Sequence, residues 1–138
     1  GAAVANRYWQ DTAQDLKRIR EQSASPDEAL QRYPQIFRKS LEAANRLCLS
    51  SFMAAEYEDL PEEVKREVQC FVEANVTWLT EVLNEKLPEK TEKNAQRALA
   101  IYTAVAGAQL IARTRQDMTI FDSLMATYQE TGLIPLSR

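Results

Sequence analysis

The sequence predicts an all-α domain, an antiparallel bundle of five main helices and one short helix. Apolar residues recur with helical spacing along most of the chain, and no stretch alternates apolar and polar residues as a strand would. Glycine is scarce, at 3 of 138 residues, while strong helix formers are frequent. The length is that of one ordinary domain, so residues 1–138 are treated as a single unit.

The first two helices follow from an apolar stripe and a start signal. Residues 2–22 carry the one-sided stripe of an amphipathic helix. Ser25 precedes a proline and stands three positions before an acidic residue, which is a capping box at the start of a second helix. Pro34 lies inside this second helix, so we expect a kink or a break near Arg32 and Tyr33.

Local signals also delimit the later helices. The short helix is expected over residues 49–57. Asp59 is the expected N-cap of a third main helix, because a proline and two carboxylates follow it. A fourth helix begins at Thr91 or Asn94, and Asp117 is the expected N-cap of the fifth. These positions complete the predicted bundle.

The fourth helix has an unusual composition. It carries no charged side chain between Arg97 and Arg113, and most of its small residues are alanine. A helix that is apolar nearly all round is buried on more than one side. Gly107 costs about 1 kcal/mol of helix propensity relative to Ala, which a close contact would offset. Two readings follow: a central core helix of a monomer, or a helix that also packs across a subunit interface.

The fourth and fifth helices carry more apolar surface than three amphipathic partners can cover. This imbalance predicts a homodimer in which two helices from each subunit form a four-helix bundle. The expected interface residues are Ala104, Gly107, Ala108, Ile111, Phe121, Leu124, Met125 and Tyr128.

Composition argues against several classes of function. Net charge is −3, and no cluster of Lys and Arg alternates with aromatic residues, so this chain by itself is not expected to bind nucleic acid. Histidine is absent, which removes the commonest general base and metal ligand. We therefore expect no enzyme, no metal and no cofactor. There is no run of 18 apolar residues and no signal peptide, so we expect a cytoplasmic protein without a membrane span.

Three segments occur in a distinctive order and spacing. They are R-L-C-L-S-S-F-M-A-A-E at 46–56, D-L-P-E-E-V-K-R-E-V at 59–68 and A-V-A-G-A-Q-L-I-A-R at 104–113. Over about residues 25–130 the chain resembles the C-terminal domain of TetR-family transcriptional repressors. The resemblance implies a domain that binds a small effector and forms a homodimer.

In that family a three-helix DNA-binding domain of the helix-turn-helix type precedes this domain. Residues 1–24 offer none of its features, so we expect that domain to be missing here and DNA to be contacted only through it. Residues 1–22 would then be the connecting helix. An effector that prefers one spacing of the two connecting helices would change the distance between the DNA-binding heads.

The resemblance also implies a cavity between the first four main helices. An aromatic, largely apolar lining with a few polar groups suits a small organic effector. Plain core packing is the alternative reading of each aromatic residue, and a backbone-bonded amide is the alternative for the one asparagine. The expected lining residues are Trp9, Tyr33, Phe37, Phe52, Met53, Phe71, Asn75, Trp78 and Tyr102.

Two further readings stay open. Cys48 is a candidate thiol sensor, as some members of the family carry, or else a buried inert cysteine. The alternative for the whole chain is a helical dimerisation or adaptor domain with no small ligand. A regulator is expected to have an enclosed pocket, whereas an adaptor is expected to have a filled core and an outer groove.

Overall fold

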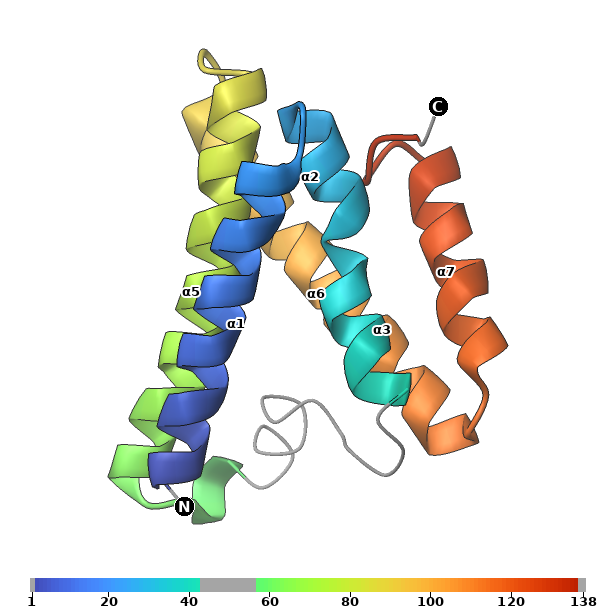
Figure 1. The fold of residues 1–138 in the computed structure, drawn as a ribbon. Coiled ribbons are helices and arrows are strands. Elements are labelled where there is room, and N and C mark those ends of the chain that lie inside the picture. Colours follow the sequence, from blue (N-terminus) through green and yellow to red (C-terminus); the bar gives the residue numbers. More distant parts are fainter. Residues whose placement is uncertain (1, 43–56, 137–138) are drawn as a thin grey trace.

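The computed structural model describes residues 2–42 and 57–136. The described residues form helices and contain no strand, so the predicted all-α class is confirmed (Figure 1). The elements are α1 (Ala2–Gln22), α2 (Pro26–Arg32), α3 (Pro34–Glu42), the 3₁₀ turn η1 (Tyr57–Asp59), α5 (Glu62–Lys86), α6 (Thr91–Arg115) and α7 (Met118–Glu130).

Successive long elements run in opposite directions, but α1 and α5 pack side by side and point the same way (Figure 1). Two side-chain contacts fix this parallel pairing. The indole nitrogen of Trp9 donates to Glu67 Oε2 at 2.6 Å near the start of both helices. The guanidinium of Arg20 donates to both carboxylate oxygens of Glu85, at 2.8 and 2.6 Å, near their ends. Helix α1 is thus attached along α5.

The break predicted near Arg32 and Tyr33 is confirmed, because α2 ends at Arg32 and α3 begins at Pro34. Pro34 has no N–H group for a continuous helix, and its ring crowds the preceding turn. The expected capping box is present in a shifted form, in which the acidic side chain bonds the residue before the N-cap. Ser25 Oγ accepts from the backbone N–H of Glu28 at 3.2 Å, and the Glu28 carboxylate accepts from Ala24 N at 2.7 Å.

The start of α5 differs from the prediction. Asp59 is not its N-cap, because Asp59 closes η1 and the helix begins at Glu62 after an N-cap at Pro61 that makes no side-chain bond. Glu63 joins Glu62 in the first turn, where both carboxylates complement the helix dipole. The short helix expected over 49–57 lies outside the described residues except for its last residue, which begins η1.

The predicted fourth and fifth helices are both confirmed. The fourth begins at Thr91, and the fifth is capped by Asp117, whose side chain accepts from Thr119 N at 2.9 Å. One side of α6 belongs to the core. Its buried apolar residues are Ala98, Ile101, Tyr102, Val105, Ala108 and Ala112. On another side Leu99 and Ile111 are 52% and 45% exposed, so the single chain leaves part of this apolar helix uncovered.

Candidate functional site

Six of the nine residues expected to line a cavity form one group, here called the interior cluster. It consists of Tyr33, Phe37, Phe71, Asn75, Trp78 and Tyr102. The ring of Tyr33 stacks on Trp78 with centroids 5.8 Å apart, and it meets Phe37 edge-on at 5.6 Å. Tyr102 meets Phe37 at 6.3 Å and Phe71 at 6.4 Å, both edge-on. These rings come from Tyr33 at the break and Phe37 on α3, from the middle of α5 and from the core side of α6.

The polar centre of the interior cluster is Asn75, which is fully buried. Its Oδ1 accepts from the hydroxyl of Tyr33 at 2.7 Å, and its Nδ2 donates to the carbonyl oxygen of Phe71 at 2.9 Å. Both ends of the amide are therefore bonded, as a buried amide requires. The backbone bond supports the structural reading of Asn75, and the bond from Tyr33 places the amide inside the aromatic cluster as well.

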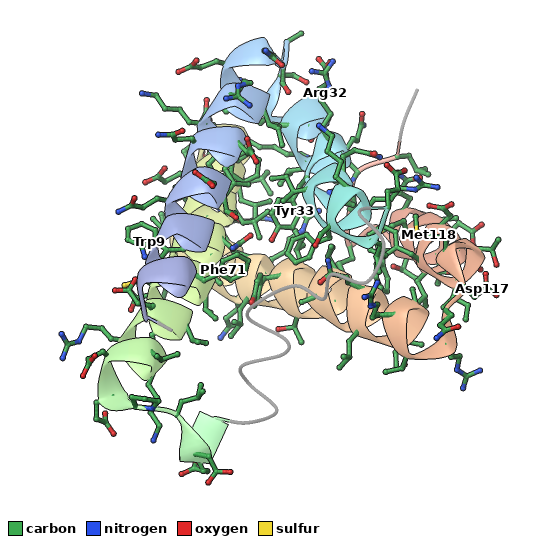
Figure 2. The ribbon with its side chains drawn as sticks, turned by 60° about the horizontal axis from the view of Figure 1, so that its bottom comes forward. Trp9, Arg32, Tyr33, Phe71, Asp117 and Met118 are labelled. Atoms are coloured by element: carbon green, nitrogen blue, oxygen red, sulfur yellow. The ribbon has the colours of Figure 1, made fainter. Side chains whose placement is uncertain are left out.

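Trp9 does not join the interior cluster. Figure 2 shows it at the outer edge of α1, whereas Tyr33 and Phe71 lie in the interior between α3, α5 and α6. Trp9 lines a groove of about 330 Å³ between α1 and α5, and Trp78 lines the same groove. The remaining members of the predicted lining, Phe52 and Met53, and the candidate sensor Cys48 lie outside the described residues.

Gln109 is a polar residue of the core that the sequence analysis missed. Its side chain is 1% exposed, and Nε2 donates to the carbonyl oxygen of Phe37 at 3.0 Å. Its Oε1 has no hydrogen-bond partner among the described residues. The sequence feature that could have identified it is its position as the single amide in the apolar run from Ala104 to Ala112. This amide ties α6 to α3 beside the interior cluster.

The residues expected at a dimer interface fall into two groups. Gly107 and Ile111 are exposed on α6, and Ala104 on α6 and Leu124, Met125 and Tyr128 on α7 are partly buried. Ala108 and Phe121, in contrast, are buried in the core of the single chain. Two large exposed apolar residues of α6 were not predicted, Leu99 and Leu110. A Cβ atom built on Gly107 would meet nothing within 4 Å.

Ion pairs hold the outer helices to the bundle. The guanidinium of Arg38 on α3 bonds both carboxylate oxygens of Asp122 on α7, at 2.8 and 3.0 Å, and these bonds lower the pKa of Asp122. In the same way, the bond from Arg20 lowers the pKa of Glu85. On α7, partial burial raises the pKa of Tyr128, whose hydroxyl donates to Ala104 O at 3.1 Å.

The described residues contain neither a membrane-spanning helix nor a metal-binding cluster. None of their helices has the length and apolarity needed to cross a membrane. No three or more of their Cys, Asp and Glu side chains come together as a group that would hold a metal ion.

No protein-family model and no curated protein matches the sequence. Two solved structures share the fold. A TetR transcriptional regulator from Legionella pneumophila superposes with a TM-score of 0.85 at 26% identity, over 95% of this chain and 71% of that one. A TetR-family transcriptional regulator from Agrobacterium tumefaciens gives a TM-score of 0.83 at 22% identity, over 94% of this chain and 71% of that one. The chain is therefore a TetR-like helical domain.

Proposed function

We propose that this chain, which has the fold of TetR-family transcriptional regulators, is the regulatory domain of such a regulator. The observation that carries the proposal is the fold match over 95% of the chain. In this proposal residues 1–138 form one domain that binds a small, largely apolar effector and homodimerises in the cytoplasm. DNA is contacted only by a helix-turn-helix domain that precedes it in the parent protein, and the domain itself catalyses no reaction.

The interior cluster supports effector binding. Its aromatic rings come from three segments that only the fold brings together, and it contains a buried Tyr–Asn pair. Gln109 adds a buried carbonyl oxygen without a partner among the described residues, which a donor group on an effector would satisfy. Binding sites for small molecules commonly combine an apolar aromatic lining with a few such polar groups.

The uncovered side of α6 supports a homodimer. Leu99, Leu110 and Ile111 expose 39–52% of their surface, and the helix carries no charge from Ala98 to Ala112. Gly107 has open space around it although it weakens the helix, and a close approach by a second chain would explain its presence there. In the proposed interface, the partly buried α7 residues Leu124 and Met125 lie beside this face.

The contacts of α5 support a route from effector to DNA. Phe71 and Asn75 of α5 lie in the interior cluster, and two other α5 residues, Glu67 and Glu85, bond to α1. An effector that favours one position of α5 would therefore also favour one position of α1, the proposed connecting helix. This is a population shift between two spacings of the DNA-binding heads.

The proposed dimer is tested by measuring the molar mass of the chain in solution. Light scattering coupled to gel filtration is expected to give a dimer for the native chain at micromolar concentration and a monomer for Ile111→Glu. The matched control is Leu136→Glu, because Leu136 is 61% exposed but lies in the C-terminal tail rather than on α6. A native chain that is monomeric under these conditions contradicts the dimer.

Effector binding is tested by a thermal-shift screen with aromatic and amphipathic small molecules. A compound that raises the melting temperature of the native chain is expected to lose its effect in Phe71→Leu. Val82→Ala is the control, since it weakens the core of the same helix about three turns further along. If no compound shifts the melting temperature while the dimer persists, the adaptor function is favoured.

The link to DNA is tested by the coding sequence upstream of residue 1. We expect it to encode a helix-turn-helix domain, and an upstream region without one contradicts the regulator function.

A further inference from the structure

Both tryptophans of the chain line one groove on the outside of the bundle. The groove lies between α1 and α5 and has a volume of about 330 Å³, near the lower end of the usual range for small-molecule sites. Its remaining walls are formed by Ala13, Leu16, Cys70, Glu73, Ala74, Thr77 and Glu81. Trp78 also belongs to the interior cluster, but no other residue of that cluster lines the groove.

The two indole rings are held in place before any ligand arrives. The N–H group of Trp9 is fixed by Glu67 Oε2 at 2.6 Å. The ring of Trp78 stacks on Tyr33 with planes 20° apart, so Tyr33 covers one of its faces. Rings fixed in this way lose little freedom when a ligand packs against them, which favours binding.

The charged residues that line the groove have one sign. Among its lining residues the charged side chains are Glu73 and Glu81, both exposed, and neither makes an ion pair with a described residue. Lys17, Arg18 and Arg66, which lie close to its walls in the sequence, are exposed and do not line it. Glu67 adds a third carboxylate at the edge, where it holds Trp9.

We propose that this groove is a second binding site, for an organic cation with an apolar body. The face of an indole ring attracts a cation more strongly than any other side-chain ring does. The carboxylates of Glu73 and Glu81 attract the same charge, and the alanine and leucine walls accept the apolar part. An anion of the same shape would meet two carboxylates and, among the described residues that line the groove, no basic side chain.

Intrinsic fluorescence tests the site directly, because both tryptophans of the chain line it. We would titrate the chain with benzyltrimethylammonium and, separately, with phenylmethanesulfonate, which carries a negative tetrahedral group on the same phenylmethyl body. The expected result is a saturable change in emission with the cation and none with the anion. A response that is linear in concentration, as for free N-acetyltryptophanamide, or that is equal for the two ions overturns the proposal.

Charge variants test the location of the site. Glu73→Gln and Glu81→Gln change exposed side chains and are expected to weaken binding of benzyltrimethylammonium at least threefold each. Glu130→Gln, an exposed carboxylate on α7, is the matched control and should bind as the native chain does. Unchanged affinity in both groove variants overturns the proposal.

Alkylation of Cys70 separates this groove from the interior cluster. In a Cys48→Ser background, the cation is expected to slow the reaction of Cys70 with iodoacetamide, because Cys70 lines the groove. Saturable fluorescence changes without protection of Cys70 would place the cation elsewhere and overturn the proposal. Failure here would leave the proposed interior effector site unaffected, since that site is tested by Phe71→Leu.

Discussion

The hydroxyl of Tyr33 donates a hydrogen bond of 2.7 Å to Oδ1 of Asn75, and both side chains are fully buried. The two residues are 42 positions apart in the sequence. Tyr33 stands at the break between α2 and α3, so the break aims a tyrosine at the middle of α5. Within the interior cluster, this pair joins the break between α2 and α3 to α5.

Replacing Tyr33 by Phe is expected to lower the free energy of unfolding by about 1–3 kcal/mol, because Oδ1 of Asn75 would remain buried without its donor. Urea unfolding measures the loss. A double-mutant cycle with Asn75→Ala isolates the pair, since the tyrosine change should cost much less once the amide is gone. Additive losses in the cycle would show that the hydrogen bond contributes nothing.

Replacing Gly107 by Ala is expected to stabilise the folded monomer and to weaken the dimer. Within one chain the new methyl group meets nothing within 4 Å, so helix propensity should stabilise the monomer by up to about 1 kcal/mol. At the proposed interface the same methyl group would occupy the space of a close approach and weaken the dimer. Urea unfolding of the monomeric Ile111→Glu background and sedimentation of the single variant measure the two effects. A dimer that is strengthened would place the closest approach at another residue.

Replacing Gln109 by Glu is expected to make stability depend on pH. A protonated carboxyl group can donate to Phe37 O as the amide does, whereas a carboxylate cannot and would be buried beside that carbonyl. Burial raises the folded-state pKa of the new acid. The free energy of unfolding of the variant is therefore greatest below the unfolded-state pKa of about 4.3, and it falls as pH rises through the folded-state pKa. At pH 7 we expect a loss of about 3 kcal/mol or more relative to the native chain. Gln109→Leu is the control and should show no such pH dependence.

The pair between Arg38 and Asp122 is expected to stabilise the fold fully above about pH 4 and progressively less below it. Its hydrogen bonds hold the pKa of Asp122 below the unfolded value of about 3.9. As pH falls the unfolded chain takes up the proton first, so the contribution is present above that value and is lost through the folded pKa. The pair is half exposed, so we expect less than about 1 kcal/mol.

Thermal unfolding of Asp122→Asn at pH 7 and pH 3 measures this contribution. The loss of melting temperature relative to the native chain should be smaller at pH 3 than at pH 7. For the control Glu130→Gln, the change relative to the native chain should be the same at both pH values. A difference that grows on acidification would contradict the assignment.

The positions of the main helices followed from the sequence because their signals are local. Ser25 and Asp117 cap their helices within a few residues, and Pro34 interrupts a helix wherever the chain goes afterwards. Asp59 shows the limit of such signals. The same acidic and proline residues are compatible with an N-cap or with a 3₁₀ turn before the helix, and the chain adopts the turn.

Which neighbour each apolar residue faces was decided by the tertiary structure. An apolar stripe covers a wide arc of a helix, and packing angles select which part of the arc is buried. Thus Trp9 lies in an outer groove although its stripe suggested the interior, and Ala108 and Phe121 enter the core of their own chain. The bond from Tyr33 to Asn75 and the bond from Gln109 to Phe37 were also decided by the tertiary structure. In each case the partner belongs to another segment, which only the fold brings near.

The sequence by itself thus determined the helical class, most helix boundaries and the small-residue character of α6. Only the tertiary structure decided that α6 buries one side and exposes Leu99, Leu110 and Ile111 on another. The physical reason is that helix formation depends on residues within a turn or two. The covering of a helix face, in contrast, depends on how many partners the whole chain can bring to it.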